Sequence, residues 1–212
     1  MDSCVLFLPQ RDSETEASVE PSALPACFEK LLERVEPLFD EVLLSVVAGS
    51  ALHHCPVPVL MSPPRTGGRL AALYSAIQAC EGNPIFALSA DRPLIHVDLV
   101  HHMRRLAEDF DVVIPRHGGR YDPLCAFYTR RCLRPMEGAL DLVNRRVASF
   151  FEQIRLRCLD ADEIQRFDPH LGSLKPIESE ADYRKALKRS QARAATSKKR
   201  RRKTSRKTAR RK

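Results

Sequence analysis

Asp91 is the residue in this sequence that is best placed to do chemistry. It directly follows the apolar run from Pro84 to Ala90, which is typical of a buried strand. A carboxylate at the end of a strand suits magnesium, because Mg²⁺ takes one or two protein carboxylates and fills its other positions with phosphate oxygens and water. The other interpretation is structural, since an Asp two residues before a proline such as Pro93 commonly stabilises a turn. The local sequence leaves both interpretations open.

Four segments have patterns that become informative when they are taken in order. They are Gly67 to Ile77, Ser89 to Leu94, Asp122 to Tyr128 and Ile177 to Tyr183. They resemble the Gly-Pro-Leu-Ala-Gly helix start, the Cys-Asp-x-Pro segment, the Pro-Leu-x-Ala-Leu-Tyr segment and the Asn-Ile-Asn-Thr-Pro-Glu-Asp ending of molybdenum cofactor guanylyltransferases and related nucleotidyltransferases. The resemblance extends from Val5 to about Leu187.

The resemblance implies transfer of a nucleoside monophosphate, GMP from GTP, to a phosphorylated pterin cofactor in molybdenum cofactor biosynthesis. A phosphate oxygen of the acceptor would attack the α-phosphorus, and pyrophosphate would leave. Both reactants are anionic, so catalysis depends on neutralising charge and aligning the reacting atoms. Asp91 matches the metal-binding aspartate of the family, which favours a Mg²⁺ site over a purely structural turn. Asp122 and Pro123 match a segment expected to bind the substrate.

The segment after the first expected strand departs from the family pattern. Family members have a Gly-rich loop there, whose backbone N–H groups hold the phosphates and whose Lys neutralises them. Here Leu8 is followed by Pro9, Gln10 and Arg11, so the segment has no glycine and Pro9 has no N–H to donate. Three glutamates between Glu14 and Glu20 would also repel a triphosphate. Arg11 is the cation placed to replace the missing Lys, and we expect it to act in catalysis with Asp91.

The start of the second expected helix supplies further candidates for nucleotide binding. Arg69 replaces the family's proline and adds a cation at a helix N-terminus, where anions are stabilised. Ser62 falls near the position at which family members have an acid. The residues expected to bind the nucleotide are Leu8, Pro9, Gln10, Ser62, Gly67, Gly68, Arg69 and Leu70.

Two hypotheses about function follow from the matches and the departures. In the first, the protein is a divergent nucleotidyltransferase that uses Asp91, Arg11, Arg69 and the amide groups around Gly67 to Leu70. In the second, it is a catalytically degenerate relative that acts as a binding or scaffold protein. The fold is compatible with both, because function depends on the site and not on the fold.

The elements that must position these residues follow from the apolar pattern. Strands are expected at 4–8, 41–47, 57–60, 84–90, 112–115, 121–128 and 155–159, and helices at 26–38, 70–80, 97–108, 130–142 and 177–187. A further short helix is expected to include Phe150 and Phe151. This alternation predicts a three-layer, doubly wound α/β fold with a mostly parallel sheet. The family resemblance implies a nucleotide-diphospho-sugar-transferase-like, Rossmann-type fold. Ligands of such sheets sit beyond the carboxyl ends of the strands, where Asp91 is expected.

The charge divides the chain into two regions. Its formal net charge is +8, but residues 188–212 hold 14 Lys or Arg and no acid, so the preceding residues carry about −6. We expect an α/β domain over 1–187 and a disordered basic tail over 188–212. The tail is a candidate for nonspecific binding of nucleic acid or another polyanion. The alternative is a solubilising extension with no dedicated partner. The acidic remainder argues against a nucleic-acid-binding module that uses the whole chain.

Other classes of protein are excluded by what the sequence lacks. There is no run of about 18 apolar residues and no secretion signal, so we expect a cytoplasmic protein with no membrane partner. The 7 cysteines are scattered without a Cys-x-x-Cys pair, which indicates reduced, mostly buried thiols. The pairs His53–His54 and His101–His102 are interpreted as surface residues, because adjacent side chains point in different directions.

Overall fold

The fold is seen in a computed structural model that describes residues 1–9, 25–47, 55–62, 68–141 and 146–188. Several residues and ranges discussed above lie outside the described residues: Gln10, Arg11, the glutamates from Glu14 to Glu20, His53, His54, Gly67 and the tail beyond Lys188. Within the described residues, the expected three-layer α/β fold with a mostly parallel sheet is confirmed.

In the described part of the chain, the sheet contains eight strands. They are β1 (Ser3–Phe7), β2 (Glu41–Val47), β3 (Val59–Ser62), β4 (Ile85–Ser89), β5 (Val112–His117), β6 (Arg120–Tyr121), β7 (Cys125–Tyr128) and β8 (Leu156–Leu159). Their order is β3-β2-β1-β4-β7-β5-β6, and β8 pairs with β5. The pairs β1–β2, β1–β4, β2–β3 and β5–β8 are parallel. Only β7 interrupts this pattern in the middle of the described sheet, because it runs antiparallel to both β4 and β5.

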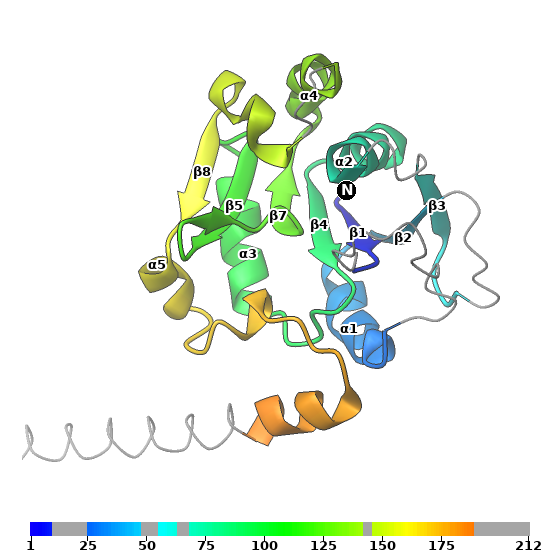
Figure 1. Cartoon of the computed structure of the whole chain (residues 1–212), viewed down its shortest axis with the longest axis vertical. Helices are drawn as coiled ribbons and strands as arrows, with labels where there is room; N and C mark the ends of the chain where they lie inside the picture. Colours follow the sequence, from blue (N-terminus) through cyan, green and yellow to red (C-terminus); the bar gives the residue numbers. More distant parts are fainter. Residues whose placement is uncertain (10–24, 48–54, 63–67, 142–145, 189–212) are drawn as a thin grey trace, which may run out of the picture.

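Helices cover both faces of the sheet (Figure 1). Those described are α1 (Phe28–Val35), α2 (Gly68–Ala79), α3 (Val97–Leu106), α4 (Leu133–Leu140), α5 (Ala161–Gln165), the 3-10 helices η1 (Glu36–Leu38), η3 (Arg130–Cys132), η4 (Val147–Gln153) and η5 (Gly172–Leu174), and a last helix over 180–188. α1, α3 and α5 contribute to the core on one face, and α2, α4 and η4 contribute to the core on the other.

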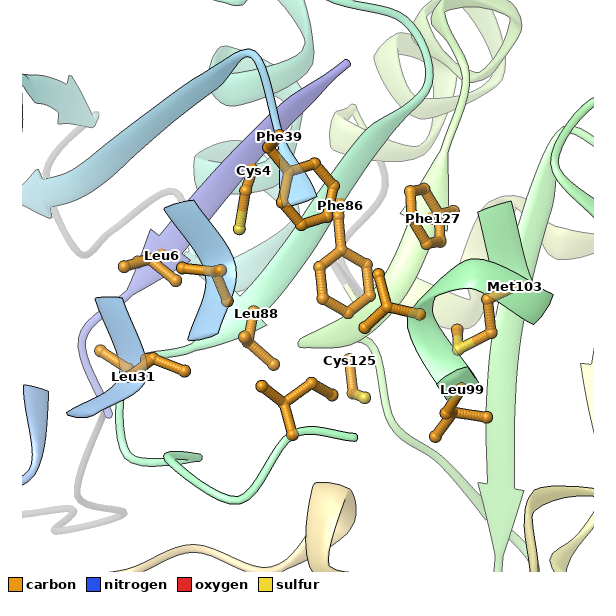
Figure 2. Close-up of a cluster of buried hydrophobic side chains, with 14 of the residues drawn as sticks. Cys4, Leu6, Leu31, Phe39, Phe86, Leu88, Leu99, Met103, Cys125 and Phe127 are labelled. Carbon is orange, nitrogen blue, oxygen red and sulfur yellow. The ribbon is translucent and has the colours of Figure 1, made fainter. Parts of the chain in front are cut away.

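The central strands are buried on both faces, which explains why their sequences are apolar without alternation. In β1, Cys4 and Leu6 belong to one core cluster, while Val5 and Phe7 belong to the other. Figure 2 shows the first cluster, where side chains from the sheet meet Leu31 of α1. The two cores hold the strands in register, and this register fixes which strand ends lie side by side.

The strand predicted over 121–128 is two separate strands in the structure. Tyr121 pairs with Arg116 in the short β5–β6 hairpin, and the chain re-enters the sheet only at Cys125. Pro123 explains the interruption, because it has no N–H for a sheet hydrogen bond. The turn is closed by a 3.2 Å hydrogen bond from the Cys125 N–H to the Asp122 carbonyl. Asp122 and Pro123 therefore lie in a turn at the edge of the sheet.

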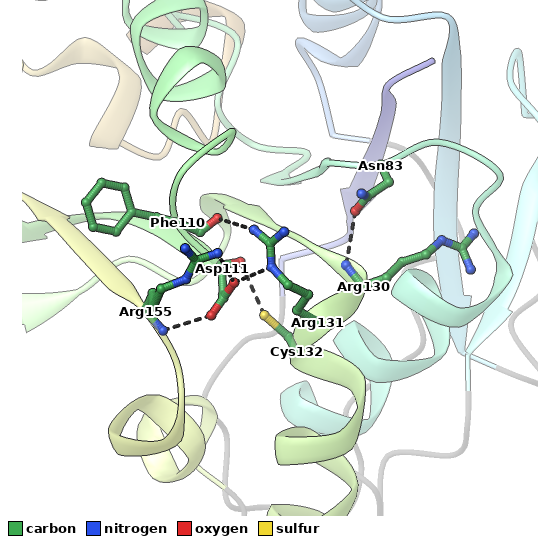
Figure 3. A network of polar contacts seen from close by, with 7 residues as sticks. All are labelled: Asn83, Phe110, Asp111, Arg130, Arg131, Cys132 and Arg155. Atoms are coloured by element: carbon green, nitrogen blue, oxygen red, sulfur yellow. Dashed lines mark hydrogen bonds and ion pairs between the residues drawn. The ribbon is translucent and has the colours of Figure 1, made fainter.

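Asp111 joins three elements at the end of the sheet where β5 and β8 begin (Figure 3). Its carboxylate accepts a 2.9 Å hydrogen bond from the Arg155 backbone N–H, a 3.3 Å bond from the Arg155 guanidinium, and a bond from Arg131 Nε. Burial acts to raise the pKa of Asp111, but the bonds from Arg155 and Arg131 outweigh it, so this pKa lies below its ordinary value. The carboxylate stabilises the folded chain while it is charged.

We expect Asp111→Asn to lower the free energy of unfolding by about 1–3 kcal/mol at neutral pH, because charged hydrogen bonds to a side chain that is only 10% exposed are lost. A depressed folded pKa contributes stability that is present above the unfolded pKa, about 3.9, and is lost as the pH falls through the lower folded value. Urea unfolding should therefore show a shallower loss of stability below about pH 5 in the variant than in the wild type. Asp109→Asn, at an exposed neighbour, is the matched control. Equal stability of all three proteins at neutral pH would contradict this role.

Candidate functional site

The sheet register places several predicted site residues at one edge. Phe7 at the end of β1 pairs with Ser89 at the end of β4, and Leu88 pairs with Cys125 at the start of β7. Because β7 is antiparallel, its amino end lies beside the carboxyl end of β4. Asp91, just after β4, and Asp122, just before β7, are thereby brought to the same edge.

Arg92 links the two carboxylates. Its Nη1 forms an ion pair with Oδ2 of Asp122, and its Nε lies 3.9 Å from Oδ1 of Asp91. All three side chains are mostly buried, with exposed fractions of 14% for Arg92, 16% for Asp91 and 19% for Asp122. The edge therefore carries two carboxylates and one guanidinium in a partly dehydrated setting, where charges interact more strongly than in water.

Arg92 is not among the site residues that the sequence predicts. A basic residue between Asp91 and Pro93 in a strand-end turn was the available signal. Its partner Asp122 is distant in the sequence, and the antiparallel pairing of β4 and β7 was not predicted. Without that pairing, no local pattern connects the guanidinium to Asp122.

Asp91 itself is fixed in the turn after β4. Its backbone carbonyl accepts a 2.8 Å hydrogen bond from the Ile177 N–H, and the Arg92 N–H donates to the Ser89 carbonyl over 3.2 Å. Asp91 Oδ1 is buried and has no hydrogen-bond partner among the described residues. A buried carboxylate oxygen without a partner is costly, and a bound cation would remove that cost.

The chain from 168 to 177, here called the strap, crosses this turn. Asp168 is buried and accepts 2.7 Å hydrogen bonds from both the backbone N–H and the hydroxyl of Ser173. The Ser173 hydroxyl accepts a 2.9 Å bond from the His96 N–H, and the Ser173 carbonyl accepts a 3.4 Å bond from Arg92. The strap thus connects Asp168 to the guanidinium between the two carboxylates.

We expect Asp168→Asn to lower the free energy of unfolding by about 1–3 kcal/mol. Oδ2 of Asp168 accepts both Ser173 bonds and Oδ1 accepts the His170 N–H, whereas the amide has one oxygen and must turn its NH₂ group toward one of these donors. Urea unfolding measures the loss, and Glu108→Gln at an exposed position of the same charge type is the control. A change no larger than that of the control would show that the strap does not depend on Asp168.

The helix that follows the strap, over 180–188, is attached to α1. Lys30 of α1 forms a 2.6 Å ion pair with Glu180 and lies 4.8 Å from the centroid of the Tyr183 ring. At its start, the Asp182 N–H donates a 3.1 Å bond to the Ser179 hydroxyl, which caps the helix. The strap is therefore anchored at both of its ends.

The expected phosphate-binding segment is described only at its beginning. Leu8 is partly buried against the core, and Pro9 is exposed. The Ala90 N–H donates a 2.8 Å hydrogen bond to the Phe7 carbonyl, so this segment starts directly beside the Asp91 turn. Leu8 and Pro9 are thus brought to the candidate site, although their contact with nucleotide stays a prediction.

Of the residues expected at the start of α2, the structure describes Gly68, Arg69 and Leu70. Gly68 begins the helix with φ +65, a conformation that other residues adopt only with strain. Arg69 is partly exposed, whereas Leu70 is fully buried in the same core cluster as Phe7. Leu70 can therefore offer a ligand only its backbone, while Arg69 can offer a side chain.

Ser62 lies on a strand that is not adjacent to β4. It ends β3, and the order β3-β2-β1-β4 puts three strand spacings, about 14 Å, between β3 and β4. Its hydroxyl is buried and hydrogen-bonded to the Ser45 hydroxyl of β2. The structure does not bring Ser62 to the Asp91–Arg92–Asp122 cluster, and its role stays a prediction.

The donor atoms fit a magnesium site that relies on a single carboxylate. Among the described residues there is no group of three or more His, Cys, Asp or Glu side chains able to hold a metal. Asp91 has a buried oxygen that lacks a hydrogen-bond partner there, whereas Asp122 is engaged by Arg92. Because Mg²⁺ accepts one or two carboxylates and takes phosphate and water as its other ligands, Asp91 is a suitable protein ligand.

Comparison with known proteins gives the family. Residues 26–158 match the MobA-like NTP transferase domain, and this range includes Asp91, Arg92 and Asp122. The chain belongs to the MobA-like NTP transferase family. It is 28% identical over 144 residues to a probable molybdenum cofactor guanylyltransferase of Peptoclostridium acidaminophilum, a match that covers 64% of this chain and 65% of that protein. It is 26% identical over 153 residues to one from Pelotomaculum thermopropionicum, covering 69% and 73% of the two chains.

Solved structures extend the similarity at the level of the fold. Molybdopterin-guanine dinucleotide biosynthesis protein A from Archaeoglobus fulgidus matches with a TM-score of 0.64 at 18% identity, over 86% of this chain and 96% of that one. The 4-diphosphocytidyl-2C-methyl-D-erythritol synthase of Anaerococcus prevotii matches with a TM-score of 0.56 at 11% identity, over 85% and 94%. No helix in the described part of this MobA-like chain is long and apolar enough to cross a membrane.

Proposed function

We propose that this MobA-like protein is a nucleotidyltransferase of molybdenum cofactor biosynthesis. Its substrates would be GTP and a phosphorylated pterin, and its products the guanylylated pterin and pyrophosphate. Asp91 carries the proposal, because its buried carboxylate oxygen has no hydrogen-bond partner among the described residues and lies at the sheet edge where folds of this type bind ligands. The family match and the names of the relatives support the same assignment.

In this proposal Asp91 holds the magnesium ion. When bound, Mg²⁺ would supply positive charge to the triphosphate and make the α-phosphorus more susceptible to attack. The hydrogen bond from the Ile177 N–H to the Asp91 carbonyl keeps the turn in place, so the carboxylate does not have to reorganise as charge develops. Asp91 is therefore a positioned ligand for the cation that accompanies the nucleotide.

The start of α2 is proposed to bind the triphosphate. The first amide groups of a helix point outward and favour anions, and Arg69 adds a full positive charge beside them. Arg11 and Gly67, outside the described residues, are proposed to complete this cradle. These groups would compensate for the exposed Pro9, which has no N–H to offer.

The acceptor is proposed to bind near Asp122 and Pro123. The Pro123 carbonyl accepts a 2.9 Å hydrogen bond from the buried Tyr128 hydroxyl, which fixes the turn before β7. The β5–β6 hairpin leads directly into this turn and carries the exposed Arg116 and Arg120. Cations at this position suit a phosphorylated acceptor, because they reduce the repulsion between two anionic substrates.

Calorimetric titration with GTP and CTP, each with and without Mg²⁺, tests the proposal. We expect GTP to bind in the micromolar to millimolar range and Mg²⁺ to strengthen its binding. Failure of both nucleotides to bind at millimolar concentration would reject the nucleotidyltransferase assignment. Stronger binding of CTP than of GTP would keep a nucleotidyltransferase but change its donor.

The second candidate is a catalytically degenerate MobA-like protein that binds or delivers the cofactor. The observation that favours it is the ion pair between Arg92 and Asp122, which leaves Asp91 as the carboxylate available to a metal in this cluster. Pterin binding without release of pyrophosphate would identify this function.

We propose separately that residues 188–212 bind polyanions. A salt-dependent affinity for duplex DNA that is lost when these residues are deleted would support this proposal.

A further inference from the structure

Arg92 lies closer to the carboxylate of Asp122 than to that of Asp91. It is paired with Asp122, yet its Nε and Oδ1 of Asp91 stand 3.9 Å apart, and both of these atoms are buried without a hydrogen-bond partner among the described residues. A third contact runs from its Nη1 to the Ser173 carbonyl of the strap. The guanidinium is therefore held by Asp122 and the strap, and it stands beside Asp91 without closing a bond to it.

This arrangement sets the charge that an approaching cation meets. Asp91 and Asp122 together carry two negative charges, and Arg92 cancels one of them. The guanidinium remains charged at every physiological pH. A divalent cation would meet one available carboxylate and a permanent positive charge a few ångströms away.

We propose that Arg92 is a resident counter-cation that withholds Asp122 from divalent metals, so that the protein alone binds Mg²⁺ weakly and binds it well only together with a nucleoside triphosphate. The inference rests on the proposed function, because it takes Asp91 as the metal ligand. The triphosphate supplies the oxygen ligands and negative charge that Arg92 denies to the metal. Metal and nucleotide are thereby coupled, and binding of either raises the affinity for the other.

The test measures Mn²⁺ binding to the full chain by electron paramagnetic resonance of free Mn²⁺, in the absence of nucleotide. Wild type, Arg92→Gln and Arg92→Lys are compared with Asp91→Asn. We expect Arg92→Gln to bind Mn²⁺ at least about tenfold more tightly than wild type, because it gains a second ionised carboxylate and loses a positive charge. Arg92→Lys keeps the charge and should remain within about threefold of wild type.

The double variant Arg92→Gln/Asp122→Asn identifies the source of the gain. It removes both members of the ion pair, so its Mn²⁺ affinity should return toward that of wild type. A gain that survives in the double variant would overturn the proposal, because Asp122 would then not be the ligand released. Tightening equal in Arg92→Lys and Arg92→Gln would also overturn it, because charge would not be the cause.

Thermal unfolding is the control that shows whether Arg92→Gln is folded. Arg92→Gln leaves Asp122 buried without its partner, so we expect a lower melting temperature that Mn²⁺ restores more strongly than it stabilises wild type. If Arg92→Gln has a lower melting temperature that Mn²⁺ does not restore, the proposal is contradicted. An unchanged affinity of Arg92→Gln for Mn²⁺ would contradict it equally. If Arg92→Gln loses metal-independent GTP binding and gains no Mn²⁺ affinity, Arg92 binds phosphate and the proposal is wrong.

The same variants, titrated with Mn²⁺ in the presence of GTP and corrected for the Mn²⁺ that GTP binds without protein, distinguish this inference from the proposed function. If Asp91→Asn abolishes Mn²⁺ binding in the presence of GTP but Arg92→Gln gains no affinity, the inference about Arg92 fails and the function of Asp91 stands. If wild type and Asp91→Asn bind Mn²⁺ equally in the presence of GTP, Asp91 is not the metal ligand. The proposed function then loses its metal site, and the inference about Arg92 fails with it.

Discussion

Replacing Asp91 by asparagine is expected to lower the rate of pyrophosphate release by at least about 100-fold, which corresponds to about 2.7 kcal/mol of transition-state stabilisation. The amide is nearly the same size as the carboxylate, so the turn held by the Ile177 N–H should persist. It has no negative charge with which to hold the cation. The loss should appear mainly in kcat at saturating GTP, because the metal acts on charge that develops during transfer.

Asp98→Asn is the matched control for this substitution. Asp98 lies in the first turn of α3, shortly after the Asp91 turn, and its side chain is 74% exposed. Its substitution should leave the rate within about twofold of wild type, because exposed charges are strongly screened. Equal rates for Asp91→Asn and wild type would remove Asp91 from the reaction.

The largest loss of stability is expected at Phe86. Its side chain is fully buried, lies 4.6 Å from the Phe127 ring and stacks on Phe39 at 5.6 Å between ring centroids (Figure 2). Phe86→Ala should lower the free energy of unfolding by about 3–5 kcal/mol, because it loses apolar burial and leaves a cavity between rigid neighbours. Urea unfolding measures this loss directly.

Phe86→Leu is the companion variant, because leucine retains most of the apolar volume. We expect it to be clearly more stable than Phe86→Ala, with a loss of about 1–2 kcal/mol relative to wild type. A loss below about 1 kcal/mol for Phe86→Ala would mean that the three rings do not form a tightly packed unit.

Much of the fold was predictable because buried parallel strands have continuous apolar sequences. The predicted strands at 41–47, 84–90 and 112–115 correspond closely to β2, β4 and β5. The helix predicted over 130–142 was less accurate, since it consists of η3 followed by α4. Pro135 accounts for the difference, because it has no N–H to donate to a carbonyl one turn earlier.

A site residue was predictable only where its local sequence alone determines its place in the fold. Asp91 could be placed at the sheet edge because it directly follows a recognisable strand. Arg92 could not be assigned a partner, because its ion pair with Asp122 depends on the antiparallel insertion of β7. Asp168 is missed for a different reason, because its local bonds to Ser173 lie in a segment without regular periodicity. Contacts between distant segments are set by tertiary packing, which a single sequence does not display.

We propose that this MobA-like chain transfers a nucleotide despite the altered segment after β1. The most direct test incubates the full chain with GTP, Mg²⁺ and molybdopterin, and measures pyrophosphate together with the guanylylated product. We predict equal amounts of both, formed over repeated turnovers and dependent on Mg²⁺. Tight binding of molybdopterin with no pyrophosphate from any nucleoside triphosphate would contradict this account and identify a binding protein.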